Sequence, residues 1–333
     1  MLLDGSLIST RRRTGTENQE DWDDSMGNTG DTAFGRLLLA AVSGLLVLAM
    51  AACGSNGKGP QTRAAEPAGM KPAGTAWPLT AREKSLLHDV EQAMVQSCMA
   101  RKGFQVWKVP ENPVPEDRSF PYVVDDVAWA QRHGYGSDVR RRIAQVRRTD
   151  PNRRYLQSLP SHRRTQAIDA YSGKTGGLEV RLPTGAIAGR STDGCLAETE
   201  GKLYGGLGKW FRAKAVTNSL ASIRRADVFA DPQFRESTRE WEACMRQHGH
   251  RYTDPSQARE AFASDRAKDQ KEEVRTAVDE ARCAHSTGLS ATAQRLDARY
   301  DKRLQKKYRA AVDSRLQLER AAIPRARAYL SGH

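Results

Sequence analysis

The sequence predicts a mainly α-helical body with one small β-hairpin, two disulfides and a long C-terminal helix. Apolar residues recur at helical spacing in several segments that begin at capping residues and end at glycines. Residues 178–182 alternate between apolar and polar as a half-buried strand does. Four cysteines follow Cys53 and account for the disulfides. We expect four parts: residues 1–52, 53–79, 80–230 and 231–333.

An export signal is predicted from Arg36 to Cys53. Sixteen uncharged residues, Leu37 to Ala52, follow Arg36, and two alanines precede Cys53. A basic residue, an apolar core and small residues before the cleavage point are typical of a secretory signal peptide. A cysteine at that point is typical of a lipobox, whose thiol receives a diacylglyceryl group. We therefore expect residues 1–52 to be removed, Cys53 to carry fatty acyl chains, and the protein to stay on the extracytoplasmic face of the cell membrane.

Other interpretations of this segment remain open. The apolar run is slightly long for a signal core and short for a membrane span of about 20 residues, so an uncleaved transmembrane anchor and ordinary secretion are alternatives. Met50 stands where a lipobox usually has leucine. Residues 1–35 are polar and hold seven acidic residues, which favours Met26 as the start of translation. The arginines at 11–13 lie too far from the apolar run to favour a twin-arginine signal.

The mature chain from Cys53 is strongly basic. It holds 49 basic and 33 acidic residues, a net charge of +16. Such a charge favours contact with an anionic wall polymer, with acidic lipid heads or with a partner protein of the cell envelope, and an exported protein does not meet nucleic acid routinely. The alternative explanation is the codon bias of an arginine-rich, GC-rich genome.

Residues 53–79 are rich in glycine, proline and alanine and predict a flexible tether.

Two segments that follow the tether share a local pattern. The first helix is expected to begin at Thr80, which forms a capping box with Glu83, and to end at Gly103. A second helix is expected between Asp231 and Gly249. Both present a cysteine near their end in the pattern C-M-x-x-x-G, which suggests a weak internal repeat.

The remaining cysteines suggest two disulfides. Cys98, Cys195, Cys244 and Cys283 are an even set, and in an oxidising compartment they allow three pairings. Cys195 begins a short helix expected to end near residue 205, and Cys283 lies on a helix expected to end before residue 288. Pairing within each half, Cys98 with Cys195 and Cys244 with Cys283, is the simplest connectivity. The cysteine and histidine spacings do not match a zinc site, so no metal or other cofactor is expected.

With these motifs in view, the chain resembles a group of secreted actinobacterial lipoproteins of uncharacterised function. The resemblance rests on the lipobox, the two C-M-x-x-x-G segments, and the stretches from Phe120 to Gly136, Leu182 to Gly205 and Val278 to Leu289. It covers most of the mature chain and implies no established activity.

Several further elements complete the expected fold. A short helix is predicted from residue 125 to 132, and Val139, Ile143 and Val146 mark the apolar side of another. Residues 178–182, a turn at 183–185 and residues 186–188 form the hairpin, which must pack on helices because one hairpin is not an independent fold. From Leu296, apolar residues recur every four positions, which predicts a long helix that Pro324 ends or kinks.

A run of arginines is the most distinctive candidate site. Residues 140–164 hold nine arginines and a single acid, Asp150. Guanidinium groups suit phosphate oxygens, so we expect an anionic-ligand surface; the alternative is a solvated face of helix and loop. The proposed surface comprises Arg140, Arg141, Arg142, Arg147, Arg148, Arg153 and Arg154, with Arg163 and Arg164 beyond it.

Other candidate sites are weaker. Histidines 248, 250 and 285 lie near the second cysteine pair, but surface polar histidines are the more common case. Asp125 and Asp126 are adjacent carboxylates, although Asp126 is better explained as a helix N-cap. Trp129, Tyr135 and Tyr204 suit sugar stacking, but buried aromatics are the ordinary case. The sequence holds no familiar hydrolase, metalloprotease, P-loop or dinucleotide motif, so no catalytic residue is assigned.

These observations predict a non-enzymatic binding or scaffold protein of the cell envelope. An envelope hydrolase without a recognisable motif is the alternative. Converging carboxylates in a cleft would favour the hydrolase, whereas a basic face would favour binding.

Overall fold

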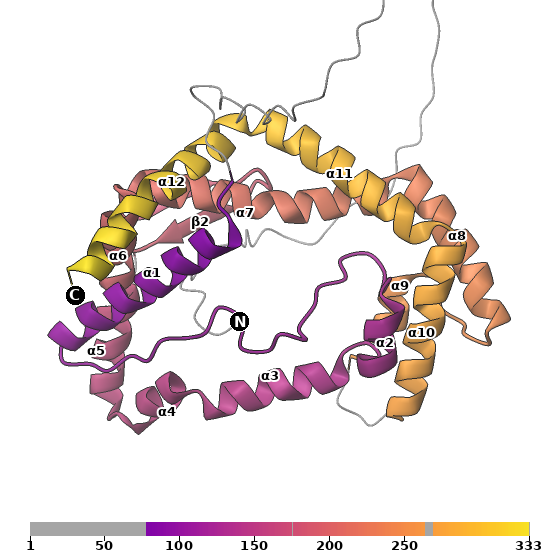
Figure 1. Ribbon diagram of the computed structural model, residues 1–333, viewed down its shortest axis with the longest axis horizontal. Helices are drawn as coiled ribbons and strands as arrows, with labels where there is room; N and C mark the ends of the chain where they lie inside the picture. The colour runs from indigo at the N-terminus through magenta and orange to yellow at the C-terminus, as the bar shows by residue number, and fades with distance from the viewer. Residues whose placement is uncertain (1–77, 175, 264–268, 333) are drawn as a thin grey trace, which may run out of the picture. The chain divides into compact units, whose positions relative to one another are not determined.

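Helices dominate the part of the chain that the computed structural model describes, residues 78–174, 176–263 and 269–332 (Figure 1). In these residues the structure contains twelve helices and one two-stranded sheet, which confirms the predicted fold class. No helix in these three ranges is long and apolar enough to cross a membrane. The predicted export signal, Cys53 and most of the predicted tether lie outside the described residues.

The elements follow one another in the order α1(Ala81–Arg101), α2(Val127–His133), α3(Ser137–Thr149), α4(Pro151–Ser158), α5(Ser161–Ser172), β1(Leu178–Arg181), β2(Ile187–Arg190), α6(Cys195–Tyr204), α7(Leu207–Ala230), α8(Pro232–Gln247), α9(Pro255–Glu260), α10(Gln270–Ser286), α11(Leu289–Lys307) and α12(Arg309–Ser331).

Helices α1 and α8 begin and end as their capping residues predict. At α1, Glu83 accepts a hydrogen bond from the Thr80 N–H (2.8 Å) and its own N–H donates to Thr80 Oγ1 (3.3 Å), which completes the capping box. At α8, Asp231 accepts from the Gln233 N–H (2.9 Å). The chain then leaves each helix through a glycine with positive φ, Gly103 (+79°) and Gly249 (+84°).

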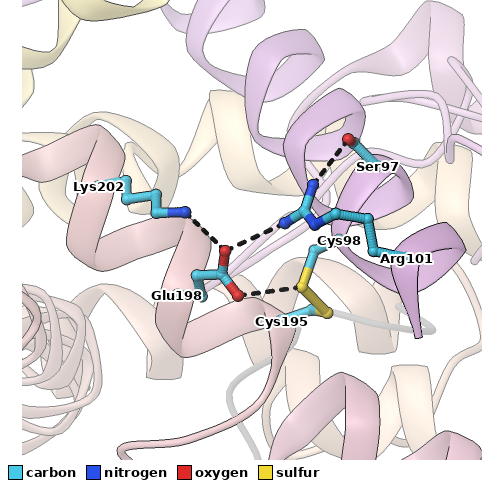
Figure 2. Close-up of a disulfide and its surroundings, with 6 residues drawn as sticks. All are labelled: Ser97, Cys98, Arg101, Cys195, Glu198 and Lys202. Carbon is cyan, nitrogen blue, oxygen red and sulfur yellow. Dashed lines mark hydrogen bonds and ion pairs between the residues drawn. A yellow bond between two sulfur atoms is a disulfide. The ribbon is translucent and has the colours of Figure 1, made fainter.

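Two disulfides join these helices to their partners downstream. Cys98 of α1 pairs with Cys195 of α6, and Cys244 of α8 pairs with Cys283 of α10, each with a Cα–Cα distance of 5.7 Å. Each cysteine thus pairs within its own half of the chain, 80–230 or 231–333, as the sequence predicted. In Figure 2 the Glu198 carboxylate lies beside the first bridge, 3.3 Å from Cys98 Sγ, and ion-pairs with Arg101 and Lys202. A disulfide sulfur carries no proton, so this contact is not a hydrogen bond.

The hairpin packs on a helix, as predicted. Strands β1 and β2 are antiparallel, with Val180 opposite Ala188. Ala188 is fully buried against Phe211 and Ala215 of α7, and Val180 packs against the same cluster. The small sheet therefore depends on α7 for its apolar cover.

The predicted long C-terminal helix is present as α12, but the segment from Leu296 onward is divided between two helices. The four-residue stripe predicted one helix from Leu296 onward, but α11 and α12 are separated at Tyr308 (φ −108°, ψ 28°). Both helices contact α7, and Figure 1 shows them following it. A stripe of period four drifts by about 40° per step, so one straight helix would turn its apolar residues away from α7. Pro324 does not end α12, which continues to Ser331.

The largest core joins residues from both sides of position 230. Tyr122, Val124 and Trp129 pack with Trp241 and Leu296 in one buried cluster. A second cluster joins α1 and α6 to α7 and α12. The two disulfide-bonded segments thus share their apolar interior.

Loss of either disulfide should lower the free energy of unfolding. The bridges close segments of 97 and 39 residues, so loop-closure entropy predicts upper costs of about 5 and about 4 kcal/mol respectively. Urea unfolding of Cys98→Ala/Cys195→Ala and Cys244→Ala/Cys283→Ala measures both costs. Wild-type stability in either double variant would contradict the stabilising role of that bridge.

Candidate functional site

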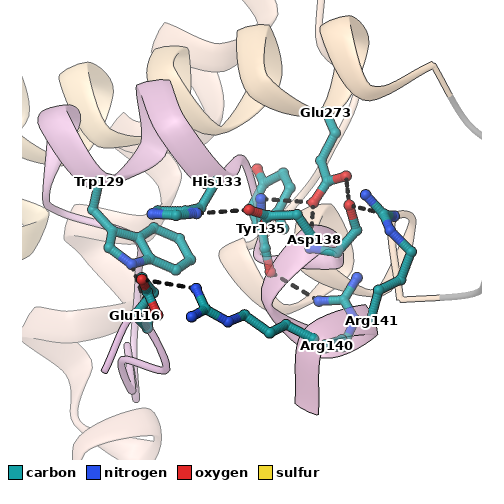
Figure 3. Close-up of polar contacts among 10 residues, drawn as sticks. Glu116, Trp129, His133, Tyr135, Asp138, Arg140, Arg141 and Glu273 are labelled. Carbon is teal, nitrogen blue, oxygen red and sulfur yellow. Dashed lines mark hydrogen bonds and ion pairs between the residues drawn. The ribbon is translucent and has the colours of Figure 1, made fainter. Parts of the chain in front are cut away.

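The arginine-bearing helix α3 begins at a turn that α10 holds in place. Its N-cap, Gly136, has no side chain to accept a hydrogen bond from the first turn. Glu273 of α10 accepts instead, from the N–H groups of Tyr135 (2.9 Å) and Ser137 (3.0 Å) and from the Ser137 hydroxyl (Figure 3). A Cβ at Gly134 would lie 2.7 Å from the Glu273 side chain, so this position requires glycine.

A second carboxylate of α10 holds the same turn from within the core. Glu280 is fully buried and accepts from the Tyr135 hydroxyl (2.5 Å) and the Val124 N–H (2.8 Å). Burial raises the pKa of Glu280 to about 7, against the lowering effects of these hydrogen bonds and of Arg259. Burial, followed by the charge of Glu280, raises the pKa of Tyr135 well above its ordinary value.

Arg140 belongs to this turn and does not face a ligand. Its guanidinium donates to the carbonyls of Tyr135 (2.9 Å) and Phe262 (2.6 Å). The Tyr135 and Phe262 rings stack with centroids 5.2 Å apart. Arg140 therefore joins the start of α3 to the residues that directly follow α9, and it is left out of the binding surface.

The next two arginines of α3 are exposed and have polar neighbours. Arg141 donates to Ser137 Oγ (3.3 Å), and Arg142 ion-pairs with Glu116 at 3.0 Å. The Arg142 side chain is 59% exposed. Exposed ion pairs of this kind are worth about 0–1 kcal/mol, so both guanidinium groups can exchange these contacts for a ligand at low cost.

Three arginines of the proposed surface have side chains that make no polar contact with the described residues. Arg148 at the end of α3, and Arg153 and Arg154 in α4, are exposed, and their side chains have no hydrogen-bond or ion-pair partner among the described residues. We call these three residues the arginine triplet. Arg147 beside them is half-buried, and its Nε is buried without a partner in the same part of the chain.

The helix dipole adds to the positive potential at α4. Arg153 and Arg154 lie near its N-terminal end, where the backbone N–H groups carry partial positive charge. Asp150 caps this end by accepting from the Asn152 N–H (2.9 Å). Cations at a helix N-terminus are unfavourable, and a bound anion would relieve that repulsion.

The last two arginines of the run serve the fold. Arg164 donates to the carbonyls of Leu156, Gln157 and Leu159 at 2.9 to 3.1 Å, which satisfies the C-terminal end of α4. Arg163 lies over the Phe104 ring, 4.5 Å from its centroid. Neither side chain is free for a ligand without giving up these contacts.

The histidines near the second disulfide have other partners. His250 bonds to Asp279 (2.9 Å), and His285 to the Asp125 carbonyl (2.6 Å). His248 lies with Cys244 and Cys283 in a group whose ligand atoms are within 4.8 Å of one another. Both sulfurs are in the disulfide, so this group offers no thiolate to a metal ion.

The adjacent carboxylates face different partners. Asp126 caps α2 by accepting from the Trp129 N–H (2.8 Å), as predicted, and this bond together with Arg118 lowers its pKa. Asp125 accepts from the Ser290 hydroxyl (2.7 Å). The two groups thus fix segments of the fold.

The aromatic residues considered for sugar stacking are buried. Trp129, Tyr135 and Tyr204 are each 5% exposed. Trp129 donates from Nε1 to the Glu116 carbonyl (3.1 Å), and Tyr204 stacks on Trp210 with centroids 3.6 Å apart. These rings present no face to a sugar.

A buried charged cluster was not anticipated from the sequence. Glu200 of α6 pairs with Arg190 and with Lys214 (3.1 Å), and the Tyr204 hydroxyl donates to Glu91 of α1 (3.1 Å). Burial raises the pKa of Glu91, whereas Lys214 and Arg190 outweigh burial and lower the pKa of Glu200. The position of Glu200 on the apolar side of its helix is the sequence signal that would have indicated this cluster.

Comparisons with protein-family models, with curated proteins and with solved structures find no match to this chain.

The buried Glu280 should make stability fall as pH rises. Its pKa is about 7 in the fold against 4.5 ordinarily, so the folded protein binds more protons between these values and loses about 3 kcal/mol of unfolding free energy across them. Glu280→Gln should remove this loss. Urea unfolding at pH 5 and pH 7.5 tests it, with Glu272→Gln, exposed on the same helix, as the control. The same pH difference in the Glu280→Gln variant and the wild type would contradict the assignment.

Proposed function

We propose that the protein is a lipoprotein held at Cys53 on the extracytoplasmic face of the cell membrane, where it binds an anionic envelope component without catalysis. The arginine triplet carries this proposal, because its guanidinium groups are exposed and lack partners among the described residues. Arg141, Arg142 and Arg147 extend the surface along α3. An acidic partner protein is a further ligand of compatible charge.

Phosphate is the ligand group that this surface suits best. A guanidinium offers several N–H donors in one plane and pairs with two phosphate oxygens at once. Arg153 and Arg154 are neighbours on a short helix, and Arg148 lies in the last turn of the helix before it. Several phosphates along a polymer or a lipid surface would therefore be engaged together.

The proposed location is supported by two independent features. The run from Arg36 to Cys53 is typical of a lipoprotein signal. The four cysteines of the body are all in disulfides, which persist in oxidising compartments and are rare in the cytosol. Export brings the basic surface to wall polymers and lipid heads.

One observation favours an envelope hydrolase as a second candidate. The pKa values of Glu91 and Glu200 are shifted in opposite directions, as in pairs that supply an acid and a base. Glu200 is 4% exposed, however, and its two oxygens are occupied by Arg190 and Lys214. A substrate could not reach this carboxylate without opening the cluster, so binding is the better supported function.

Neutralising the arginine triplet should weaken anion binding. We expect Arg148→Gln/Arg153→Gln/Arg154→Gln in the full chain to bind phosphatidylglycerol vesicles and inorganic polyphosphate about a hundredfold more weakly at low salt, because each basic residue near an anionic surface contributes roughly 1 kcal/mol. Vesicle co-sedimentation and polyphosphate titration measure the change.

The control removes the same charge elsewhere. Arg212, Arg225 and Arg327 are exposed on α7 and α12, and their guanidinium groups likewise have no partner among the described residues. Their triple glutamine variant should lose much less affinity. Equal losses in the two triple variants would show that net charge, and not the α3–α4 surface, drives binding.

A further inference from the structure

An aromatic pair with one exposed member involves α4, the helix that carries Arg153 and Arg154. Trp107, in the segment after α1, is 37% exposed, and its ring meets that of the half-buried Tyr155 edge-on with centroids 5.6 Å apart. Tyr155 directly follows Arg153 and Arg154 in α4. Aromatic rings and guanidinium groups are thus presented by the same short helix and the segment that packs on it.

Trp107 is fixed to the first turn of α4 through its backbone. The Trp107 N–H donates to Asn152 Oδ1 (2.9 Å), and Asn152 Nδ2 donates to the Trp107 carbonyl (3.0 Å). Asn152 is 5% exposed and immediately precedes Arg153. Because both hydrogen bonds use backbone atoms of Trp107, they hold its position without using the indole. The edge-on contact with Tyr155 restricts the indole itself, so the ring loses less conformational entropy when it binds a ligand.

Exposure sets Trp107 apart from the other tryptophans that the structure describes. Trp129, Trp210 and Trp241 are at most 5% exposed and pack within apolar clusters. An exposed indole offers a flat apolar surface whose electron-rich face attracts the C–H groups of a sugar ring. The adjacent guanidinium groups suit phosphate.

We propose that the arginine triplet, Trp107 and Tyr155 form one binding surface for a polymer that carries both sugar and phosphate groups. This inference rests on the proposed function and names its ligand class. The arginines bind the phosphates of the repeating unit, and the indole packs against a sugar ring between them.

A membrane surface fits the aromatic residues less well. The exposed large apolar residues of the described chain belong to four separate segments: Trp107 follows α1, and Ile168, Ile187 and Leu330 lie in α5, β2 and α12. Proteins that insert into a bilayer interface present such side chains together on one face. One tryptophan fixed against a tyrosine next to arginines is better suited to a single ring of a ligand.

The test compares two polymers that differ in sugar alone. The full chain is titrated with glycosylated poly(glycerol phosphate) and with the unglycosylated polymer at equal phosphate content. We expect the wild type to bind the glycosylated polymer about two- to tenfold more tightly. Trp107→Ala should abolish this preference, whereas Trp107→Phe should retain part of it and Ile168→Ala, an exposed apolar residue on α5, should leave it intact.

The outcomes separate this inference from the proposed function. A wild type that does not distinguish the two polymers, or a Trp107→Ala variant that keeps the preference, would overturn the sugar site while the arginine surface stands. Tighter binding to phosphatidylglycerol vesicles that depends on Trp107 would replace the sugar with a membrane and also overturn it. If Arg148→Gln/Arg153→Gln/Arg154→Gln binds both polymers as the wild type does, the proposed function itself fails.

Discussion

The orientation of the arginine-bearing helix depends on two carboxylates that lie far from it in sequence. Glu273 and Glu280 of α10 bind the N–H and hydroxyl groups around Tyr135, more than 130 positions earlier in the chain. Arg140 completes the junction from the α3 side by donating to the Tyr135 carbonyl. Because α10 is in turn bridged to α8 through Cys244 and Cys283, the start of α3 is tied to the disulfide-bonded core.

Contacts within the fold explain why only part of the arginine run has side chains without internal partners. The first arginine satisfies carbonyls at the start of α3, and the last two satisfy α4 and cover Phe104. The arginines between them project from helices whose ends are already satisfied. A fold that uses the outer members of the run for its own hydrogen bonds thereby leaves the arginine triplet without internal partners. The aromatic pair at α4 adds an apolar surface to this cationic one.

Elements governed by neighbouring residues were predictable from the sequence. The sequence correctly predicts features that depend only on neighbouring residues. These are the capping box at Thr80, the caps at Asp126 and Asp231, and the glycines that follow α1, α2 and α8. The two disulfides join distant cysteines and were also predicted, because the order of the cysteines along the chain suggests their pairing. Other features that depend on distant partners were not predictable. The break at Tyr308 follows from packing on α7, and the inward direction of Arg140 follows from carbonyls at Tyr135 and Phe262. The charged cluster around Glu200 likewise joins α1, β2, α6 and α7, and no local pattern specifies those partners.

The intact mass of the protein from the host's membrane fraction tests the proposed location most directly. It is measured without reduction, and again after reduction and alkylation. A mass that begins at Cys53 and includes lipid, with four cysteines alkylated only after reduction, is the predicted result. A mass that retains residues before Cys53, or cysteines that react without reduction, would contradict export and place the basic surface among intracellular partners.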